Sequence, residues 1–309
     1  MPRLGVIDLG SNSVRLVIYE AKRSAHSAKP FRILVDEKKM AGLAAYVTDG
    51  IFTAAGIARA ADILSDHLSI ARNLSCDRVD IFATAVLRNC KNSAVAVASI
   101  EEAIEHPINL LSGAEEAALG LAGASIGRPL GRGALIDIGG GSTELTALAD
   151  EGRAATAPGV SLPLGSVAAY AQFVRLVLPT LEECRAIAEA MQAQMGTIAD
   201  MGPYRAERLY GIGGSVRAIV KMQAHTLAIP AKPAFVGKAA LDRLFVLLQD
   251  DPATFAHNAV KAAPDRVHTL VPGMVIARTI MESLHAETIA VCKYGIREGY
   301  LMERMLDRS

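Results

Sequence analysis

The sequence has no excess of charge of either sign. Its 309 residues include 32 Lys and Arg and 32 Asp and Glu, so the formal net charge is zero at neutral pH. Proteins dedicated to nucleic acids obtain most of their affinity from surplus lysine and arginine. The balance therefore argues against a nucleic-acid partner, but it is compatible with an anionic substrate bound in a local basic cleft.

Cysteines are few, and long hydrophobic runs are absent. The four cysteines, Cys76, Cys90, Cys184 and Cys292, have neither metal-site nor redox spacing, which indicates buried thiols in a reducing compartment. No run of about 18 apolar residues exists, and Asp8 interrupts the N-terminal apolar stretch. We therefore expect no membrane span and no signal peptide, which makes a cytoplasmic enzyme the expectation.

What the sequence does contain is a repeated Asp–Gly turn. Residues 5–18 read GVIDLGSNSVRLVI and residues 134–145 read ALIDIGGGSTEL, which aligns Asp8 with Asp137. In each copy an apolar strand ends at the acid, small residues form a tight turn, and a second strand follows. A chain of this length is long for one core, so the repeat indicates two similar halves, each beginning at one of these turns.

Both halves have the pattern of three strands followed by alternating helices and strands. In the first half we expect strands at 4–8, 14–21, 31–38, 79–83 and 108–111, and helices at 53–73, 93–105 and 113–127. In the second half we expect strands at 133–137, 144–149, 154–161, 209–211 and 288–292, and helices at 166–176, 181–199, after 215, 238–249, 252–262, 268–284 and 295–306. The duplicated βββαβαβα order predicts the α/β class, with a mixed sheet flanked by helices in each half. Residues 125–132, which include Gly and Pro, are the predicted hinge.

The two turns have the composition of phosphate-binding loops. Their small residues let backbone N–H groups point into one concavity, and their hydroxyls add donors. The loop residues are Gly10, Ser11, Asn12 and Ser13 in the first copy and Gly139, Gly140, Gly141 and Ser142 in the second. Asp8 and Asp137 end the preceding strands, and an acid beside phosphate calls for a cation, usually Mg²⁺. A single copy would favour an ordinary glycine hairpin, whereas the aligned pair favours phosphate binding.

Three weaker signals follow other strands. The loop of Gly213, Gly214 and Ser215 precedes a helix, whose N-terminus attracts anions, although such loops are common. Residues 112–117, SGAEEA, open another helix, where acids usually stabilise the dipole but one of them could orient a water. Arg88 either clamps a phosphate with its planar fork or is a solvated surface residue.

Together these strings resemble the exopolyphosphatase/guanosine pentaphosphate phosphatase (Ppx/GppA) family. The matching strings occur in family order at residues 7–13, 84–88, 112–117, 136–144, 213–215, 271–273 and 294–299. The resemblance implies the two-lobed actin-like ATPase (ribonuclease H-like) fold, with lobes at 1–126 and 127–309 and no additional C-terminal helical domain. Packing of the C-terminal helix, 295–309, on the first lobe is left open. It also implies Mg²⁺-assisted hydrolysis of phosphoanhydrides in an interlobe cleft.

The resemblance also implies roles for individual residues. Glu116 matches the catalytic glutamate that positions the attacking water, and Arg88 matches the arginine that neutralises the terminal phosphate. Asp137 and Glu144 match acids of the metal and water site, to which the position of Asp8 adds a third acid. The three loops are expected to bind substrate, together with Arg266, whose match is to a family arginine of less certain role.

The chain departs from the family pattern at two places. Many relatives have a basic residue two positions after the catalytic glutamate, where this sequence has Ala118. Full-length bacterial members continue with helical domains that help to hold long polyphosphate, whereas this sequence ends at Ser309, which puts strong processivity in doubt.

Several functional questions stay open at this point. We expect release of terminal phosphate from inorganic polyphosphate, with guanosine pentaphosphate as the alternative substrate, because no residue pattern indicates a nucleobase pocket. A more distant alternative is an ATP-dependent phosphotransferase of the same fold, against which the SGAEEA string argues. A homodimer is compatible with the apolar C-terminal helix, and so is burial of that helix in the core.

Overall fold

The computed structural model describes residues 1–21, 30–127, 129–149, 159–232 and 234–306. It divides into two compact units, Met1–Arg128 with Tyr294–Ser309, and Pro129–Lys293. The end of the chain therefore groups with the first unit and not with residues 129–293. The first division falls within the segment 125–132 that the sequence suggests as a hinge.

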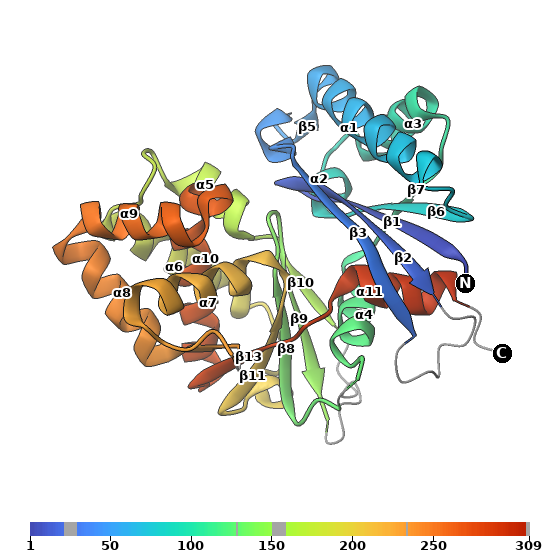
Figure 1. Cartoon of the computed structure of the whole chain (residues 1–309). Helices are drawn as coiled ribbons and strands as arrows, with labels where there is room; N and C mark the ends of the chain where they lie inside the picture. The colour runs from blue at the N-terminus through green and yellow to red at the C-terminus, as the bar shows by residue number, and fades with distance from the viewer. Residues whose placement is uncertain (22–29, 128, 150–158, 233, 307–309) are drawn as a thin grey trace. The chain divides into compact units, whose positions relative to one another are not determined.

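The first unit is built on a five-stranded mixed sheet with the order β3-β2-β1-β6-β7 (Figure 1). Its strands are β1 (Arg3–Leu9), β2 (Ser13–Ala21), β3 (Phe31–Met40), β6 (Arg78–Ala83) and β7 (Ile108–Leu110). The first three are antiparallel neighbours, while β1, β6 and β7 run parallel. This arrangement confirms the mixed sheet expected for the first half. It also brings the carboxyl ends of β1, β6 and β7 to one edge.

Helices cover both faces of this sheet. Figure 1 shows α1 (Ala54–Asn73) and α3 (Ser93–Ile104) on one face and α4 (Gly113–Ala124) and α11 (Ile296–Tyr300) on the other. Each face has its own apolar core. As predicted, α1 begins after Thr53, whose hydroxyl accepts a hydrogen bond from the Gly56 amide.

Short elements complete the first unit. They are a 3₁₀ turn (Leu43–Tyr46), the hairpin of β4 (Val47–Thr48) and β5 (Ile51–Phe52), α2 (Ala85–Arg88), and a π-helical turn after α11 (Leu301–Met305). The sequence pattern does not predict the hairpin or α2, because segments of two to four residues are too short to show a period.

The second unit is built on a six-stranded mixed sheet with the order β10-β9-β8-β11-β13-β12. Its strands are β8 (Gly133–Ile138), β9 (Thr143–Leu148), β10 (Val160–Leu162), β11 (Arg208–Ile212), β12 (Phe235–Gly237) and β13 (Thr288–Val291). The strand predicted at 154–161 lies mostly outside the described residues, and β10 begins at Val160. The antiparallel edge strand β12 was not predicted.

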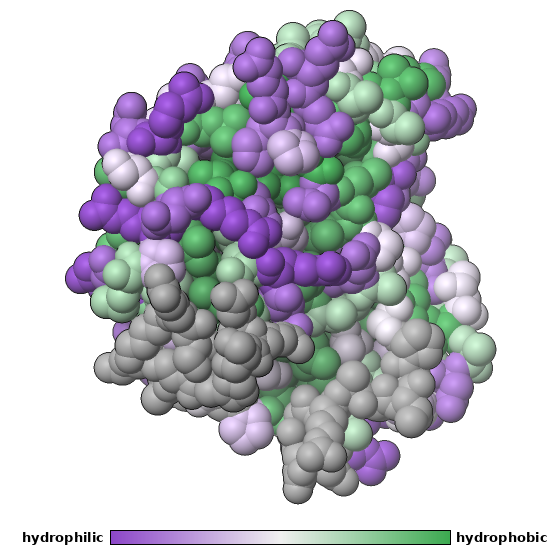
Figure 2. All heavy atoms as spheres, turned by 90° about the vertical axis from the view of Figure 1, so that its right-hand side faces the viewer, coloured by the Kyte–Doolittle hydropathy of each residue, from purple (hydrophilic) through white to green (hydrophobic). Residues whose placement is uncertain are grey.

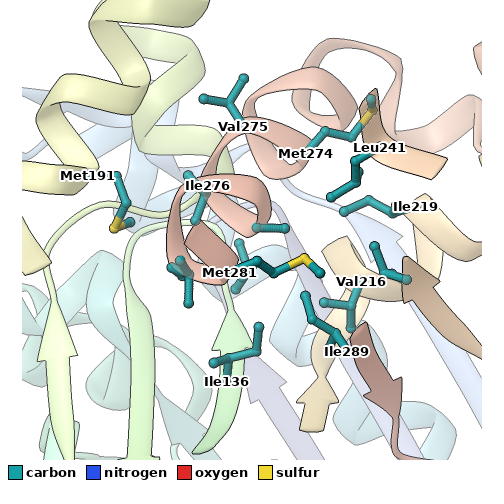
Figure 3. Close-up of a cluster of buried hydrophobic side chains, with 14 of the residues drawn as sticks. Ile136, Met191, Val216, Ile219, Leu241, Met274, Val275, Ile276, Met281 and Ile289 are labelled. Atoms are coloured by element: carbon teal, nitrogen blue, oxygen red, sulfur yellow. The ribbon is translucent and has the colours of Figure 1, made fainter. Parts of the chain in front are cut away.

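Six helices are described in the second unit. They are α5 (Ser166–Phe173), α6 (Leu181–Met195), α7 (Gly213–Leu227), α8 (Lys238–Asp250), α9 (Pro252–Ala262) and α10 (Val267–Ser283), with 3₁₀ turns at Gly202–Tyr204 and Pro264–Arg266. Figure 3 shows side chains of α10 among Ile136 of β8, Val216 of α7 and Ile289 of β13. Since α10 is buried along most of its length, it forms the centre of this core.

One face of the molecule has a mixed polar and apolar surface (Figure 2). Figure 2 shows hydrophilic residues interspersed with hydrophobic ones over the face that it displays. Among the residues that the structure describes, none of the helices is both long enough and apolar enough to cross a membrane.

Candidate active site

The first Asp–Gly turn joins β1 to β2 in the first unit. The Gly10 amide donates to the Ser13 carbonyl at 3.2 Å, which closes the hairpin. Ser11 and Asn12 are buried, and their carbonyls accept hydrogen bonds from the backbone of residues 41–44. The Asn12 side-chain amide is a buried donor without an acceptor among the described residues. The loop is therefore anchored from behind, and one of its donors is unsatisfied.

Asp8 is held by a cation from the end of the chain. Nη1 of Arg297, on α11, donates to Oδ2 of Asp8 at 2.8 Å. Burial raises the pKa of Asp8, and Arg297 partly opposes that shift. Arg15 lies opposite Asp8 in the strand register but forms two hydrogen bonds to Asp36. A metal-binding role for Asp8 stays a prediction, since its carboxylate already has a basic partner.

The structure brings Arg88 and Glu116 together. Arg88 ends α2, which follows β6, and Glu116 lies in the first turn of α4, which follows β7. Because β6 and β7 are parallel neighbours, the segments after them meet at the same sheet edge. Nη1 of Arg88 forms a short ion pair with Oε2 of Glu116 and donates to the Leu111 carbonyl at 2.9 Å. Two residues predicted to be catalytic are thus direct partners.

The structure also distinguishes Glu116 from Glu115. The Ser112 amide donates to the Glu115 carboxylate and the Glu115 amide donates to the Ser112 hydroxyl, which together form a capping box, and Glu115 also pairs with Arg304 at 3.0 Å. Its side chain is 42% exposed, whereas that of Glu116 is 8% exposed. Glu115 therefore serves the helix end, which leaves Glu116 as the acid available for chemistry.

The second Asp–Gly turn places two acids side by side in the second unit. Asp137 of β8 and Glu144 of β9 are directly opposite each other in the antiparallel register, so their side chains lie on one face. The hydroxyls of Ser142 and Ser161 both donate to Oε1 of Glu144, at 2.6 and 2.7 Å. Sequence reasoning missed Ser161, which comes from β10 and lies opposite Glu144 in the sheet.

The glycines of this loop are covered by the start of α5. The amides of Ser166 and Val167 donate to the carbonyls of Gly139 and Gly140, each at 2.9 Å. A Cβ atom at Gly165 would lie 2.5 Å from the Gly140 carbonyl, so only glycine permits this approach. The carbonyls of Gly139 and Gly140 are therefore satisfied within the unit, and α5 fixes this part of the loop.

The third loop joins the same group of residues. Gly213 has a left-handed conformation, with φ 85°, and a Cβ there would overlap Asp137. A Cβ on Gly214 would overlap the guanidinium of Arg266. Free N–H groups at a helix N-terminus and a basic side chain both favour anions. The structure thus brings Asp137, the third loop and Arg266 together.

Arg217 supports this loop and was not predicted. It lies one turn into α7 and donates to the carbonyls of Gly213 at 3.1 Å, Cys292 at 3.2 Å and Lys293 at 3.1 Å. An arginine within a helix carries no sequence signal for the contacts with Cys292 and Lys293, which lie 75 and 76 positions away. Arg217 fixes the glycine turn to the end of β13.

The acids of the second unit fit a magnesium ion better than a metal that needs a full set of protein ligands. Among the described residues, no group of three or more His, Cys, Asp or Glu side chains could hold a metal. Mg²⁺ is usually bound by one or two carboxylates together with water and substrate phosphate. Asp137 and Glu144, two adjacent acids that would otherwise repel each other, match that requirement.

Relatives with known names match nearly the whole chain. A 23% identical protein, exopolyphosphatase 1 of Mycobacterium tuberculosis, is matched over 98% of this chain and 88% of its own length. Guanosine-5'-triphosphate,3'-diphosphate pyrophosphatase of Vibrio cholerae is 27% identical over 99% of this chain, which spans 60% of that relative.

Solved structures with similar folds also match nearly the whole chain. An exopolyphosphatase from Cytophaga hutchinsonii superposes with a TM-score of 0.83 at 20% identity, covering 99% of each chain. The Aquifex aeolicus PPX-GPPA enzyme gives a TM-score of 0.75 at 20% identity, covering 98% of this chain and 99% of that one. These neighbours confirm the actin-like ATPase fold expected from the sequence. The Ppx/GppA phosphatase family model matches residues 17–308, and the chain belongs to that family.

Proposed function

We propose that this protein is a hydrolase that releases the terminal phosphate of inorganic polyphosphate. The observation that carries the proposal is the direct pairing of Arg88 with Glu116. A buried acid beside a half-buried arginine supplies both requirements of the reaction, a group to direct water and a positive charge for the phosphoryl group. Relatives named exopolyphosphatase support the same activity.

Glu116 and Arg88 divide the work in the first unit. Glu116 orients the attacking water and accepts its proton, which a positioned carboxylate can do at neutral pH. Arg88 turns part of its guanidinium to the terminal phosphate and offsets charge on the transferring group. The turn of Ser11–Ser13 supplies backbone and hydroxyl donors to phosphate oxygens.

The second unit has phosphate-binding elements of its own. The loop of Gly139–Ser142 and the N-terminus of α7, with Arg266, bind phosphate through N–H groups and positive charge. Asp137 and Glu144 would hold Mg²⁺, which when bound neutralises phosphate charge and orients the substrate. Ser142 and Ser161 fix the Glu144 carboxylate in place.

Guanosine pentaphosphate is the alternative substrate. A relative named for a guanosine substrate, from Vibrio cholerae, supports it. We favour polyphosphate because the sequence contains no pattern that indicates recognition of guanine. The more distant alternative is a phosphotransferase of the same fold, which would consume ATP only when an acceptor is present. We also propose a cytoplasmic location, and a homodimer stays a prediction.

A phosphate-release assay tests the proposal. Polyphosphates of several lengths are compared with guanosine pentaphosphate, with and without Mg²⁺. We expect release from polyphosphate that depends on Mg²⁺ and slower release from guanosine pentaphosphate. Faster turnover of guanosine pentaphosphate would select the alternative substrate. Phosphate release from neither, together with ATP consumption that depends on an added acceptor, would contradict hydrolysis and favour the phosphotransferase.

A further inference from the structure

The C-terminal segment Gly295–Met305 contacts both of the site elements in the first unit. It packs on α4, which carries Glu116, and it reaches Asp8, which precedes the first phosphate loop. Tyr300, Leu301 and Met305 are buried in the core on this face of the sheet. The segment is therefore an integral layer of the unit.

Arg297 is the cation that holds Asp8. The pair is formed by Nη1 and Oδ2 at 2.8 Å, and each side chain is 17% exposed. Arg15, opposite Asp8 in the register, is bonded to Asp36. Asp8 is the second-last residue of β1, and only three peptide bonds separate it from Ser11, so the position of its carboxylate and that of the Ser11–Ser13 loop are linked. Arg297 thus holds Asp8, a residue at the edge of the candidate site, through this ion pair.

The neighbouring residue fixes the direction in which Arg297 points. Glu298 is buried and accepts hydrogen bonds from the Tyr19 hydroxyl at 2.8 Å and from the Gly295 amide at 3.0 Å. These bonds tie α11 to β2 and close its first turn. Rotation of α11 about its axis would break the bond to Tyr19, so Arg297 is held facing Asp8.

Close packing of two backbones fixes the position of α11 against α4. A Cβ on Gly299 would overlap the Leu119 carbonyl, and a Cβ on Gly123 would overlap the Gly295 carbonyl. Helices in contact at glycines cannot slide past each other without backbone overlap. The helix that carries Glu116 and the helix that carries Arg297 are therefore fixed in position relative to each other.

We propose that Arg297 is a positioning residue for phosphoanhydride hydrolysis, acting through Asp8 on the first phosphate loop. The inference rests on the proposed function. The neutral Asp8–Arg297 pair keeps the carboxylate directed at α11, so that it does not face the phosphates bound by Ser11–Ser13. Without Arg297 the negative charge of Asp8 would be uncompensated beside an anionic substrate, and the loop would lose its lateral support.

The test combines Arg297→Met, Arg297→Lys, Asp8→Asn and the double variant Asp8→Asn/Arg297→Met. Phosphate release from polyphosphate gives kcat and KM, and thermal unfolding reports the fold. We expect Arg297→Met to lower kcat at least tenfold with a smaller change in KM, and Arg297→Lys to recover most of the loss. Because Arg297 acts through Asp8, the double variant should be no slower than the slower single variant.

The control is Arg32→Met, which breaks the exposed pair with Glu20 and should keep wild-type kcat. The double variant removes both charges at once and leaves no buried charge unpaired, so it can be measured in place of Arg297→Met if that single variant fails to fold. Wild-type kcat in Arg297→Met, or losses that multiply in the double variant, would overturn the inference while wild-type turnover upholds the proposed function. No phosphate release by the wild-type protein would overturn the proposed function, and the inference with it.

Discussion

The guanidinium of Arg88 donates directly to the carboxylate of Glu116, and the pair ties the end of α2 to the first turn of α4. The side chains are 18% and 8% exposed, so neither charge is fully solvated. A phosphate that binds to Arg88 must share it with Glu116. The two proposed roles are therefore coupled, because the residue that binds the phosphate also places the residue that directs the water.

Glu116→Gln should abolish most of the activity while the fold is kept. Glutamine has the same shape and can still accept a hydrogen bond from Arg88, but it cannot take a proton from water. A general base contributes a factor of about 10²–10⁴ in rate, so kcat for phosphate release should fall by about that factor. Thermal unfolding should remain a single transition close to that of the wild type.

Glu115→Gln is the matched control for Glu116→Gln. Glutamine preserves the capping box with Ser112, and the exposed pair with Arg304 contributes little. We expect kcat within about threefold of the wild type, because the exposed charge of Glu115 interacts only weakly with its surroundings. Equal losses in both variants would contradict the assignment of Glu116 as the base.

Replacement of Arg88 should separate its charge from its shape. Arg88→Met removes the positive charge, so kcat/KM should fall by a factor of about 10²–10³. It also leaves the buried Glu116 without this partner, so the free energy of unfolding should fall by about 3 kcal/mol. Arg88→Lys keeps the charge but loses the planar fork, and we expect an intermediate kcat/KM. Measurements at several polyphosphate concentrations, with urea unfolding of each variant, distinguish the two effects. A kcat/KM for Arg88→Met equal to that of the wild type would exclude Arg88 from phosphate binding.

The pairing of Asp137 with Glu144 predicts a response to Mg²⁺ that single substitutions should change. Two carboxylates opposite each other repel, so Glu144→Gln should leave stability without metal unchanged or slightly higher. It should also raise the Mg²⁺ concentration that gives half-maximal phosphate release, and reduce any increase in melting temperature on addition of Mg²⁺. Asp137→Asn is expected to behave in the same way. Mg²⁺ titrations that coincide for the wild type and both variants would place the metal elsewhere.

The sequence predicts the two turns well, because their signal is local. Aligning Asp8 with Asp137 places Arg15 and Glu144 at equivalent positions, and the registers confirm that each lies directly opposite its aspartate. In each copy a run of small residues between two apolar segments indicates both the turn and the pairing of the strands that flank it. The meeting of Arg88 with Glu116 also follows from sequence order, since each comes directly after one of two parallel neighbouring strands.

Contacts that depend on the tertiary fold could not be predicted. Ser161 reaches Glu144 only because β10 adds to the edge of the sheet, and Arg217 reaches Lys293 only because the fold brings the segment after β13 to α7. Arg297 lies 289 residues from Asp8. None of these residues has a local pattern that identifies its partner. The strand β12 has three residues, too few to show alternation.

His67 should make the stability of the first unit depend on pH. Its side chain is fully buried on α1, and neither ring nitrogen has a hydrogen-bond partner among the described residues. Burial, with a contribution from the charge of Lys39, lowers its pKa from 6.5 to about 4, while Asp66 opposes the shift. Below pH 6.5 the unfolded chain takes up the proton first, so stability is complete above this pH and is lost as the pH falls toward 4. The loss between pH 7 and pH 5 should be about 2 kcal/mol.

His67→Leu removes this titration and isolates it from other acid-sensitive groups. We expect urea unfolding to give nearly equal stabilities for the variant and the wild type at pH 7, or a gain for the variant, because leucine leaves no buried polar atom without a partner. At pH 5 the variant should be more stable than the wild type by about 2 kcal/mol beyond any difference at pH 7. His225→Gln, at an exposed position on α7, is the control and should follow the wild type at both pH values. If His67→Leu loses as much stability as the wild type between pH 7 and pH 5, His67 is not the group that titrates.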